Sequence, residues 1–167
     1  VSVTPGADGT VVARRTVRHV PEGSTLGLTH LERLEFRPDG TIAAAHDFVV
    51  DEGLPDLPRV GVGAQVPPGF EELEWFGRGP HENYIDRKRG AAVGRWRSTV
   101  DEQYVPYILP QEHGNKTDVR WLALRREDGI GLLVSADELV EAKASHYSDE
   151  ALGTAWHTVD LEREDVT

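Results

Sequence analysis

The sequence predicts an all-β fold, and two observations support this prediction. Short runs rich in Val, Thr and aromatic residues recur along the 167-residue chain, and turn sequences with proline, glycine or aspartate separate them. Many short strands between such turns are typical of an antiparallel sandwich or barrel. We therefore expect an all-β domain with at most one short helix, near the C-terminus.

The first half of the chain contains the clearest strand patterns. We predict strands at residues 10–20, 28–36 and 41–50. Arg37-Pro38-Asp39-Gly40 joins the last two as a hairpin, because proline presets φ and glycine accepts positive φ. The acidic residues 51–58 include two prolines and predict a loop. Strict alternation then predicts the most regular strand of the chain at Arg59–Val66.

The second half is expected to continue the β-structure. We predict strands at residues 70–76, 93–100, 119–125 and 130–134, a polar loop at 77–89 and a second hairpin turn at 126–129. Two alternatives exist near the C-terminus. Ser135 can open a helix that reaches Ala144, which periodicity weakly favours. We prefer a strand over residues 140–147, followed by a short helix capped by Ser148.

Composition limits the classes of partner. A formal net charge of −11 argues against a nucleic-acid or anionic-membrane surface. The apolar runs are too short to span a bilayer. Cysteine is absent, which permits a reducing compartment, and we expect a cytoplasmic protein. Methionine is absent too, so we interpret the chain as a fragment, a processed product or an expression product.

Two ordered motifs distinguish the middle of the chain. The first is Trp75-Phe76-Gly77-Arg78-Gly79-Pro80-His81-Glu82-Asn83-Tyr84-Ile85-Asp86-Arg87, and the second runs from Tyr104-Val105-Pro106-Tyr107 to Pro110-Gln111-Glu112-His113-Gly114. Together they resemble the C-terminal, small-chain domain of LacZ-type β-galactosidases of glycoside hydrolase family 2. That family usually has asparagine where this chain has His113. The resemblance is specific from about residue 59 to residue 161.

This resemblance implies a galactose-mutarotase-like antiparallel β-supersandwich, here a single domain over residues 1–167 that is truncated at both ends. The complete family enzymes hydrolyse terminal non-reducing β-D-galactosides, such as lactose, with retention. Their catalytic glutamates lie in a barrel domain, so we expect no catalytic residue here. Their Mg²⁺ and Na⁺ ligands come from other domains, so we expect no cofactor in this chain. The implied partners are other domains of the parent and a galactoside, and we expect a homo-oligomer.

Polar and aromatic side chains within the motifs are the candidates for sugar contact. They are Glu82, Asn83, Tyr84, Tyr104, Tyr107, Glu112 and His113. The residues expected to have a structural role are Trp75, Gly77, Gly79, Pro80, Asp86 and Arg87.

For the first motif, we expect the glycines to permit backbone angles closed to other residues. We expect Glu82, Asp86 and Arg87 to form a charge-assisted network. A structural loop is favoured over a sugar pocket for this segment, because a long loop must satisfy its own backbone groups. For Tyr104 and Tyr107, sugar contact and core packing both stay open as alternatives.

Two other functions are kept as alternatives. An aldose-1-epimerase-like enzyme needs a general acid and a general base, and His113 with Glu112 or His81 with Glu82 are the only suggestive pairs. The other alternative is a stand-alone carbohydrate-binding module. The seven histidines show no metal-ligand spacing, so no metal site is predicted. Unpaired strand edges in a truncated sandwich predict self-association or packing against partner domains.

Overall fold

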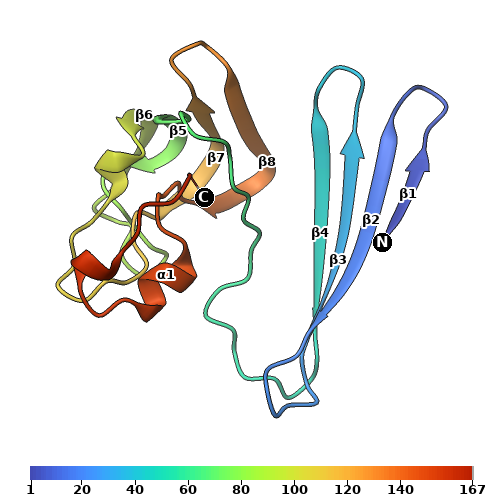
Figure 1. Ribbon diagram of the computed structural model, residues 1–167, viewed down its shortest axis with the longest axis horizontal. Helices are drawn as coiled ribbons and strands as arrows, with labels where there is room; N and C mark the ends of the chain where they lie inside the picture. The colour runs from blue at the N-terminus through green and yellow to red at the C-terminus, as the bar shows by residue number, and fades with distance from the viewer. Residues whose placement is uncertain (167) are drawn as a thin grey trace. The chain divides into compact units, whose positions relative to one another are not determined.

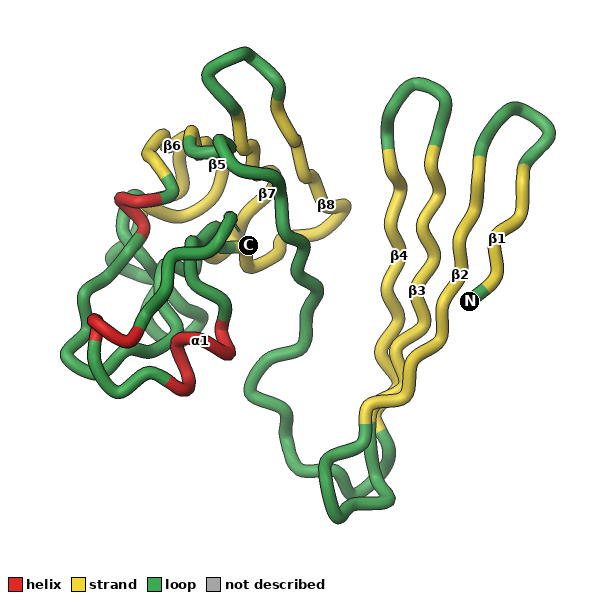
Figure 2. Tube along the Cα trace, viewed as in Figure 1, coloured by secondary structure: helices red, strands yellow, loops and turns green. Residues whose placement is uncertain are grey.

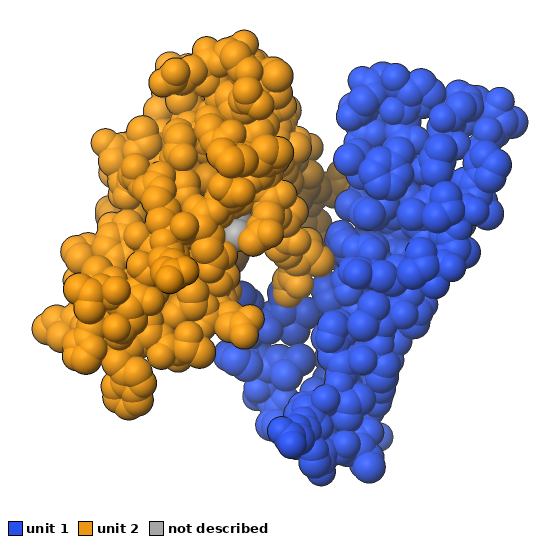
Figure 3. All heavy atoms as spheres, viewed as in Figure 1, with its two compact units in different colours: residues 1–60 blue, residues 61–167 orange. Residues whose placement is uncertain are grey.

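The computed structural model describes residues 1–166, and its regular secondary structure is almost entirely β-strand (Figure 1). The chain divides into two compact units, Val1–Val60 and Gly61–Thr167, and each contains one four-stranded antiparallel sheet (Figure 3). Within residues 1–166 there is one α-helix, α1 (Asp149–Thr154), and two short 3-10 helices, η1 (Asp101–Gln103) and η2 (Thr158–Asp160). The all-β prediction is confirmed. None of these helices is long and apolar enough to cross a membrane.

The first unit is a meander in which consecutive strands pair (Figure 2). Its strands are β1 (Ser2–Pro5), β2 (Val11–His19), β3 (Leu28–Phe36) and β4 (Ile42–Val50). The predicted strands correspond to β2, β3 and β4, whereas β1 was not predicted. The predicted hairpin turn is also confirmed, because Gly40 has a φ of 86° and its N–H donates to the carbonyl of Arg37 at 3.0 Å.

One face of this first sheet carries an apolar row that no core covers. The register places Val11, Phe36 and Ile42 side by side across β2, β3 and β4, and these residues are 38%, 40% and 57% exposed. No apolar side chain of Val1–Val60 is fully buried. A sheet normally buries one face against a second layer, so this unit lacks the packing that stabilises an isolated sheet.

The second unit contains the core of the chain. Its strands are β5 (Glu72–Gly79), β6 (Ala92–Thr99), β7 (Lys116–Arg125) and β8 (Gly131–Ala142), in the order β6-β5-β7-β8. The buried apolar cluster comprises Phe70, Leu73, Trp75, Val100, Val119, Leu122, Leu124, Ala144 and Val166. Burial of these side chains supplies the hydrophobic stabilisation of the unit.

The predicted strand at Arg59–Val66 is wrong. These residues form no strand, and Val60 and Val62 are 43% and 60% exposed. The N–H of Val66 donates to the carbonyl of Val166 at 3.0 Å. Alternation describes side chains, but a strand also needs a neighbouring strand, and within residues 1–166 no strand pairs with this segment.

The end of the chain decides between the two predicted alternatives. Strand β8 continues to Ala142, so the helix proposed from Ser135 to Ala144 is wrong, and the predicted strand at 140–147 is correct only for residues 140–142. The short helix α1 follows instead, and its N-cap is Ser148, whose Oγ accepts from the N–H of Ala151 at 3.3 Å. Asp149 and Glu150 lie in its first turn, where acidic side chains are favourable.

An acidic side chain on β5 is surrounded by arginines from three positions. Glu74 is 3% exposed and pairs with Arg95 on β6 and with Arg125 on β7, the latter at 2.9 Å. Arg97 lies 3.4 Å away. The hydrogen bond from Arg95, together with Arg125, lowers the pKa of Glu74 from 4.5 to about 2. These ion pairs connect three adjacent strands of the second sheet, β6, β5 and β7.

We expect Glu74→Gln to lower the free energy of unfolding by about 1–2 kcal/mol, because it removes charge-assisted hydrogen bonds. The depressed pKa adds stability that is present above pH 4.5 and is lost as the pH falls towards about 2. Urea titrations at pH 7 and pH 3 measure both effects. The variant should lose less stability than wild type over this pH interval, and an identical loss would contradict the assignment.

Candidate functional site

The first motif forms a loop that is held to the start of β7 by one buried amide. Asn83 has no exposed surface, and its Oδ1 accepts from the N–H and the Oγ1 of Thr117 at 2.9 and 2.5 Å. Its Nδ2 donates to the carbonyl of His81 at 3.0 Å. The Asn83 N–H donates to the carbonyl of Asn115, and the Asn115 Nδ2 donates back to the carbonyl of Asn83. These bonds, the Asn83 network, connect two segments 32 residues apart.

Glu82 connects the first motif to the second. Its carboxylate accepts from the hydroxyl of Tyr107, from the N–H of Gly114 at 2.9 Å and from Arg87 Nη2 at 2.8 Å. The side chain of Glu82 is only 9% exposed. Burial alone would raise the pKa of Glu82, but the three hydrogen bonds outweigh it and hold the pKa below its usual value. Glu82 is therefore a carboxylate that joins two loops.

A second contact between the motifs lies beside Glu82. The hydroxyl of Tyr84 donates to Glu112 Oε2 at 2.7 Å, and the guanidinium of Arg87 lies 4.5 Å from the centre of the Tyr84 ring. Burial, with the added charge of Glu112, raises the pKa of Tyr84 above its ordinary value. Tyr84 is therefore a neutral hydrogen-bond donor at physiological pH.

Asp86 is not part of this arrangement. The ion pair expected between Glu82 and Arg87 is confirmed, but Asp86 is exposed and has no hydrogen bond or ion pair within residues 1–166. The predicted three-residue network is wrong in this respect. The loop turns at this point, with the N–H of Arg87 bonded to the carbonyl of Tyr84 at 3.0 Å, and Asp86 lies on its solvent side.

The two motif glycines are needed for space and not for backbone angle. Neither Gly77 nor Gly79 has a positive φ, which corrects the sequence-based explanation. A Cβ on Gly79 would lie 2.8 Å from Trp96 and 2.9 Å from Trp75, and one on Gly77 would lie 2.9 Å from Val119. Both indoles donate to this strand segment, Trp75 to the carbonyl of Arg78 at 2.9 Å and Trp96 to that of Gly77 at 3.2 Å. Pro80, after a cis peptide bond, begins the loop.

Two charged contacts beside the motif were not predicted. Asp118 has a φ of 52° and accepts from Arg78 Nε at 2.5 Å and from Lys88 Nζ at 2.8 Å, which lowers its pKa. Lys116 is 2% exposed, and its ammonium lies 5.1 Å from the centre of the Trp75 ring. Burial lowers the pKa of Lys116 to about 8. Sequence spacing gives no signal for these pairs, because Asp118 lies 40 residues from Arg78 and 30 from Lys88, and Lys116 is similarly far from Trp75.

Tyr104 and His113 belong to a different location from Glu82. They line a pocket of about 280 Å³ together with Val100, Asp101, Ala144, Ser145, His146 and Tyr147. The rings of Tyr104 and His113 meet edge to face at 5.0 Å, and Tyr147 lies 5.4 Å from Tyr104. His113 is 2% exposed, with Nδ1 3.0 Å from the carbonyl of Gln111. Aromatic faces at a small pocket can contact the C–H faces of a sugar ring.

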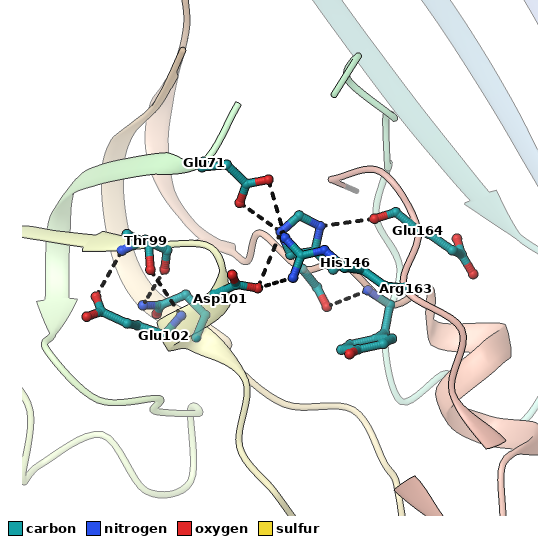
Figure 4. Close-up of polar contacts among 10 residues, drawn as sticks. Glu71, Thr99, Asp101, Glu102, His146, Arg163 and Glu164 are labelled. Atoms are coloured by element: carbon teal, nitrogen blue, oxygen red, sulfur yellow. Dashed lines mark hydrogen bonds and ion pairs between the residues drawn. The ribbon is translucent and has the colours of Figure 1, made fainter. Parts of the chain in front are cut away.

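Next to this pocket, ion pairs hold the C-terminal segment (Figure 4). Figure 4 shows Glu71, Asp101 and Arg163 converging on His146. His146 Nε2 lies 2.9 Å from Glu71 Oε2 and 2.8 Å from Arg163 Nη2, and Nδ1 lies 3.0 Å from the carbonyl of Glu164. Arg163 also pairs with Asp101. Glu71, Asp101 and His146 could together hold a metal ion, but Arg163 already supplies a positive charge between the two carboxylates.

The structure therefore separates the seven sugar-contact candidates into three groups. Across the two motifs, Glu82 pairs with Tyr107 and Tyr84 pairs with Glu112. Tyr104 and His113 line the pocket, and Asn83 is enclosed. Their proposed contact with sugar stays a prediction.

Comparison with known proteins identifies relatives. Residues 6–167 match the family described as "Beta galactosidase small chain". The chain is 42% identical over 110 residues to a β-galactosidase of Priestia megaterium, covering 66% of this chain and 11% of the relative. It is 38% identical over 129 residues to that of Vibrio cholerae, covering 77% and 12%, and 35% identical over 143 residues to that of Aeromonas hydrophila, covering 83% and 13%. The chain thus matches a small part of much longer proteins.

We expect Asn83→Ala to lower the free energy of unfolding by about 2–4 kcal/mol, since it leaves buried groups of Thr117 and His81 without partners. Asp86→Ala, three residues away on the solvent side, should change stability by less than about 0.5 kcal/mol. Thermal and urea unfolding of the two variants provide the comparison. Equal effects would show that the Asn83 network does not hold the loop.

We also expect Gly79→Ala to destabilise the chain by about 1–3 kcal/mol, because the added methyl overlaps both indoles. Gly90 is the matched control, because a Cβ there meets nothing within 4 Å and its φ is not positive. Near-ultraviolet circular dichroism should also report displaced tryptophans in Gly79→Ala only. A stable Gly79→Ala variant with an unchanged spectrum would contradict the close-packing explanation.

Proposed function

Because this chain belongs to the β-galactosidase small-chain family, we propose that it is a non-catalytic C-terminal module of a complete β-galactosidase. The complete enzyme would hydrolyse terminal non-reducing β-D-galactosides, such as lactose, with retention. The observation that carries this proposal is the joining of the two family motifs by Glu82, beside which Asn83 holds the first motif to β7. Such a network positions loops, and it gives this chain no pair of reacting groups.

The chemistry of the carboxylates supports a non-catalytic role. Retaining glycosidases need two carboxyl groups about 5–5.5 Å apart, one of them with a raised pKa so that it can donate a proton. Glu82 has a lowered pKa and is fully engaged by three donors. Glu112, the other motif carboxylate, accepts from Tyr84. We therefore assign bond cleavage to another domain of the parent. The ligands of the Mg²⁺ and Na⁺ on which the parent would depend are also assigned to other domains.

The first unit supports the proposal of partner domains. Its apolar row of Val11, Phe36 and Ile42 is exposed, and apolar sheet faces of this kind are normally covered by another layer. We propose that other parts of the parent cover it, within a galactose-mutarotase-like supersandwich. Homo-oligomer formation and a cytoplasmic location remain predictions, which sedimentation of the parent and cell fractionation would test.

The alternative functions have less support. An epimerase needs an accessible acid and base, whereas His113 is 2% exposed and its Nδ1 is engaged by the carbonyl of Gln111. The pocket beside Tyr104 favours a carbohydrate-binding module more than it favours an epimerase. Its volume, about 280 Å³, lies slightly below the range of about 300–1,000 Å³ that ligand pockets occupy.

The decisive experiment compares the isolated chain with the complete parent enzyme. We expect the isolated chain to cleave a chromogenic β-galactoside no faster than buffer and the parent to cleave it. In the parent, Glu82→Gln should lower the melting temperature while the KM of the folded enzyme stays within about twofold. Turnover by the isolated chain would overturn the proposal, as would a large KM increase in Glu82→Gln without a change in melting temperature.

A further inference from the structure

A cluster of metal-ligand side chains lies in the first unit, away from both family motifs. Its members are His30 and Glu32 on β3 and His46 on β4. Glu32 and His46 are directly opposite each other in the strand register, and His30 precedes Glu32 by two residues. Side chains two apart on a strand share a face, so all three project from the same side of the sheet.

The donor atoms of this cluster converge. His30 Nε2 lies 3.0 Å from His46 Nδ1, and His46 Nδ1 lies 3.8 Å from Glu32 Oε1. All three donor atoms lie within 4.8 Å of one another. A tetrahedral Zn²⁺ with ligand bonds of about 2.0–2.1 Å places its donors about 3.3–3.4 Å apart. An ion would replace the hydrogen bond between His30 and His46 and would require these two nitrogens to separate by about 0.3–0.4 Å, while His46 Nδ1 and Glu32 Oε1 would have to approach by about 0.4–0.5 Å.

Neighbouring side chains fix the orientation of these ligands. Phe48, the partner of His30 in the register, stacks on its ring at 4.5 Å with an interplanar angle of 18°. Arg15 contacts both oxygens of Glu32, with Nε 2.9 Å from Oε2 and Nη2 3.4 Å from Oε1, and Oε1 also faces His46. His30 is 7% exposed, and the side chains of Glu32 and His46 are 16% and 19% exposed. The site is thus preformed, partly desolvated and still open to solvent.

We propose that His30, Glu32 and His46 bind a divalent transition-metal ion, with Zn²⁺ as the best match to two imidazoles and one carboxylate. Three protein ligands leave a fourth position for water. The ion would connect β3 to β4 in a unit that has no buried apolar side chain. Arg15 opposes the charge of the ion, and one carboxylate balances only part of it. We therefore expect the dissociation constant for Zn²⁺ to be micromolar rather than femtomolar.

The test uses the full 167-residue chain, freed of metal with EDTA. Titration with Zn²⁺ should give about one ion per chain, and Co²⁺ should give the intense visible absorption of a tetrahedral site. Zn²⁺ should also raise the melting temperature of the wild-type chain. If calorimetry detects no heat of Zn²⁺ binding and Co²⁺ gives no tetrahedral spectrum up to 1 mM metal, the proposal is overturned. This measurement requires no mutation.

Variants then locate the ion. His46→Gln and Glu32→Gln should weaken Zn²⁺ binding at least tenfold, whereas His81→Ala, at an exposed histidine in the second unit, should bind as wild type does. Circular dichroism of the metal-free variants checks that they are folded. If His146→Gln abolishes binding and His46→Gln does not, the ion binds beside Glu71 and the proposal is wrong.

Discussion

The hydrogen bonds of the buried Asn83 side-chain amide are the interactions on which the second unit depends most. It satisfies backbone groups on both sides of a loop that has little regular structure, from the carbonyl of His81 to the N–H of Thr117. An amide is suited to this role because it offers donors and acceptors together. Glu82, one residue earlier, continues the connection to Tyr107 and Gly114. A motif of polar residues can therefore act as a structural joint while containing the residue types of a binding site.

Close packing explains the rest of the first motif. Trp75 has no exposed surface, and both it and Trp96 lie against the backbone at Gly77 and Gly79. Their indole N–H groups find carbonyl partners in the same segment, as buried tryptophans require. The motif thus combines a rigid aromatic wall with a loop that the wall supports.

The two units differ in the source of their stability. The second has a continuous apolar cluster around Trp75, whereas the first has an apolar face that is largely exposed, with polar groups such as His30 and Glu32 near its centre. Hydrophobic burial is the dominant favourable term in folding, so the first unit needs an additional contribution. A covering domain and a bound metal ion would both contribute on the same face of the sheet, because His30 and Glu32 share the face of Phe36.

The sequence by itself determined the all-β class, most strands and both hairpin turns, because alternation and turn chemistry are local properties. It also determined the family through the motifs around Trp75 and Tyr107. Tertiary structure alone decided that Arg59–Val66 is not a strand, because pairing needs a distant backbone. The tertiary structure also decided that the indoles next to Gly79 leave no space for a side chain there. It likewise placed His46 on β4 beside His30 on the adjacent strand β3. Contacts between residues 16 to 75 positions apart leave no local pattern, so no spacing rule predicts them.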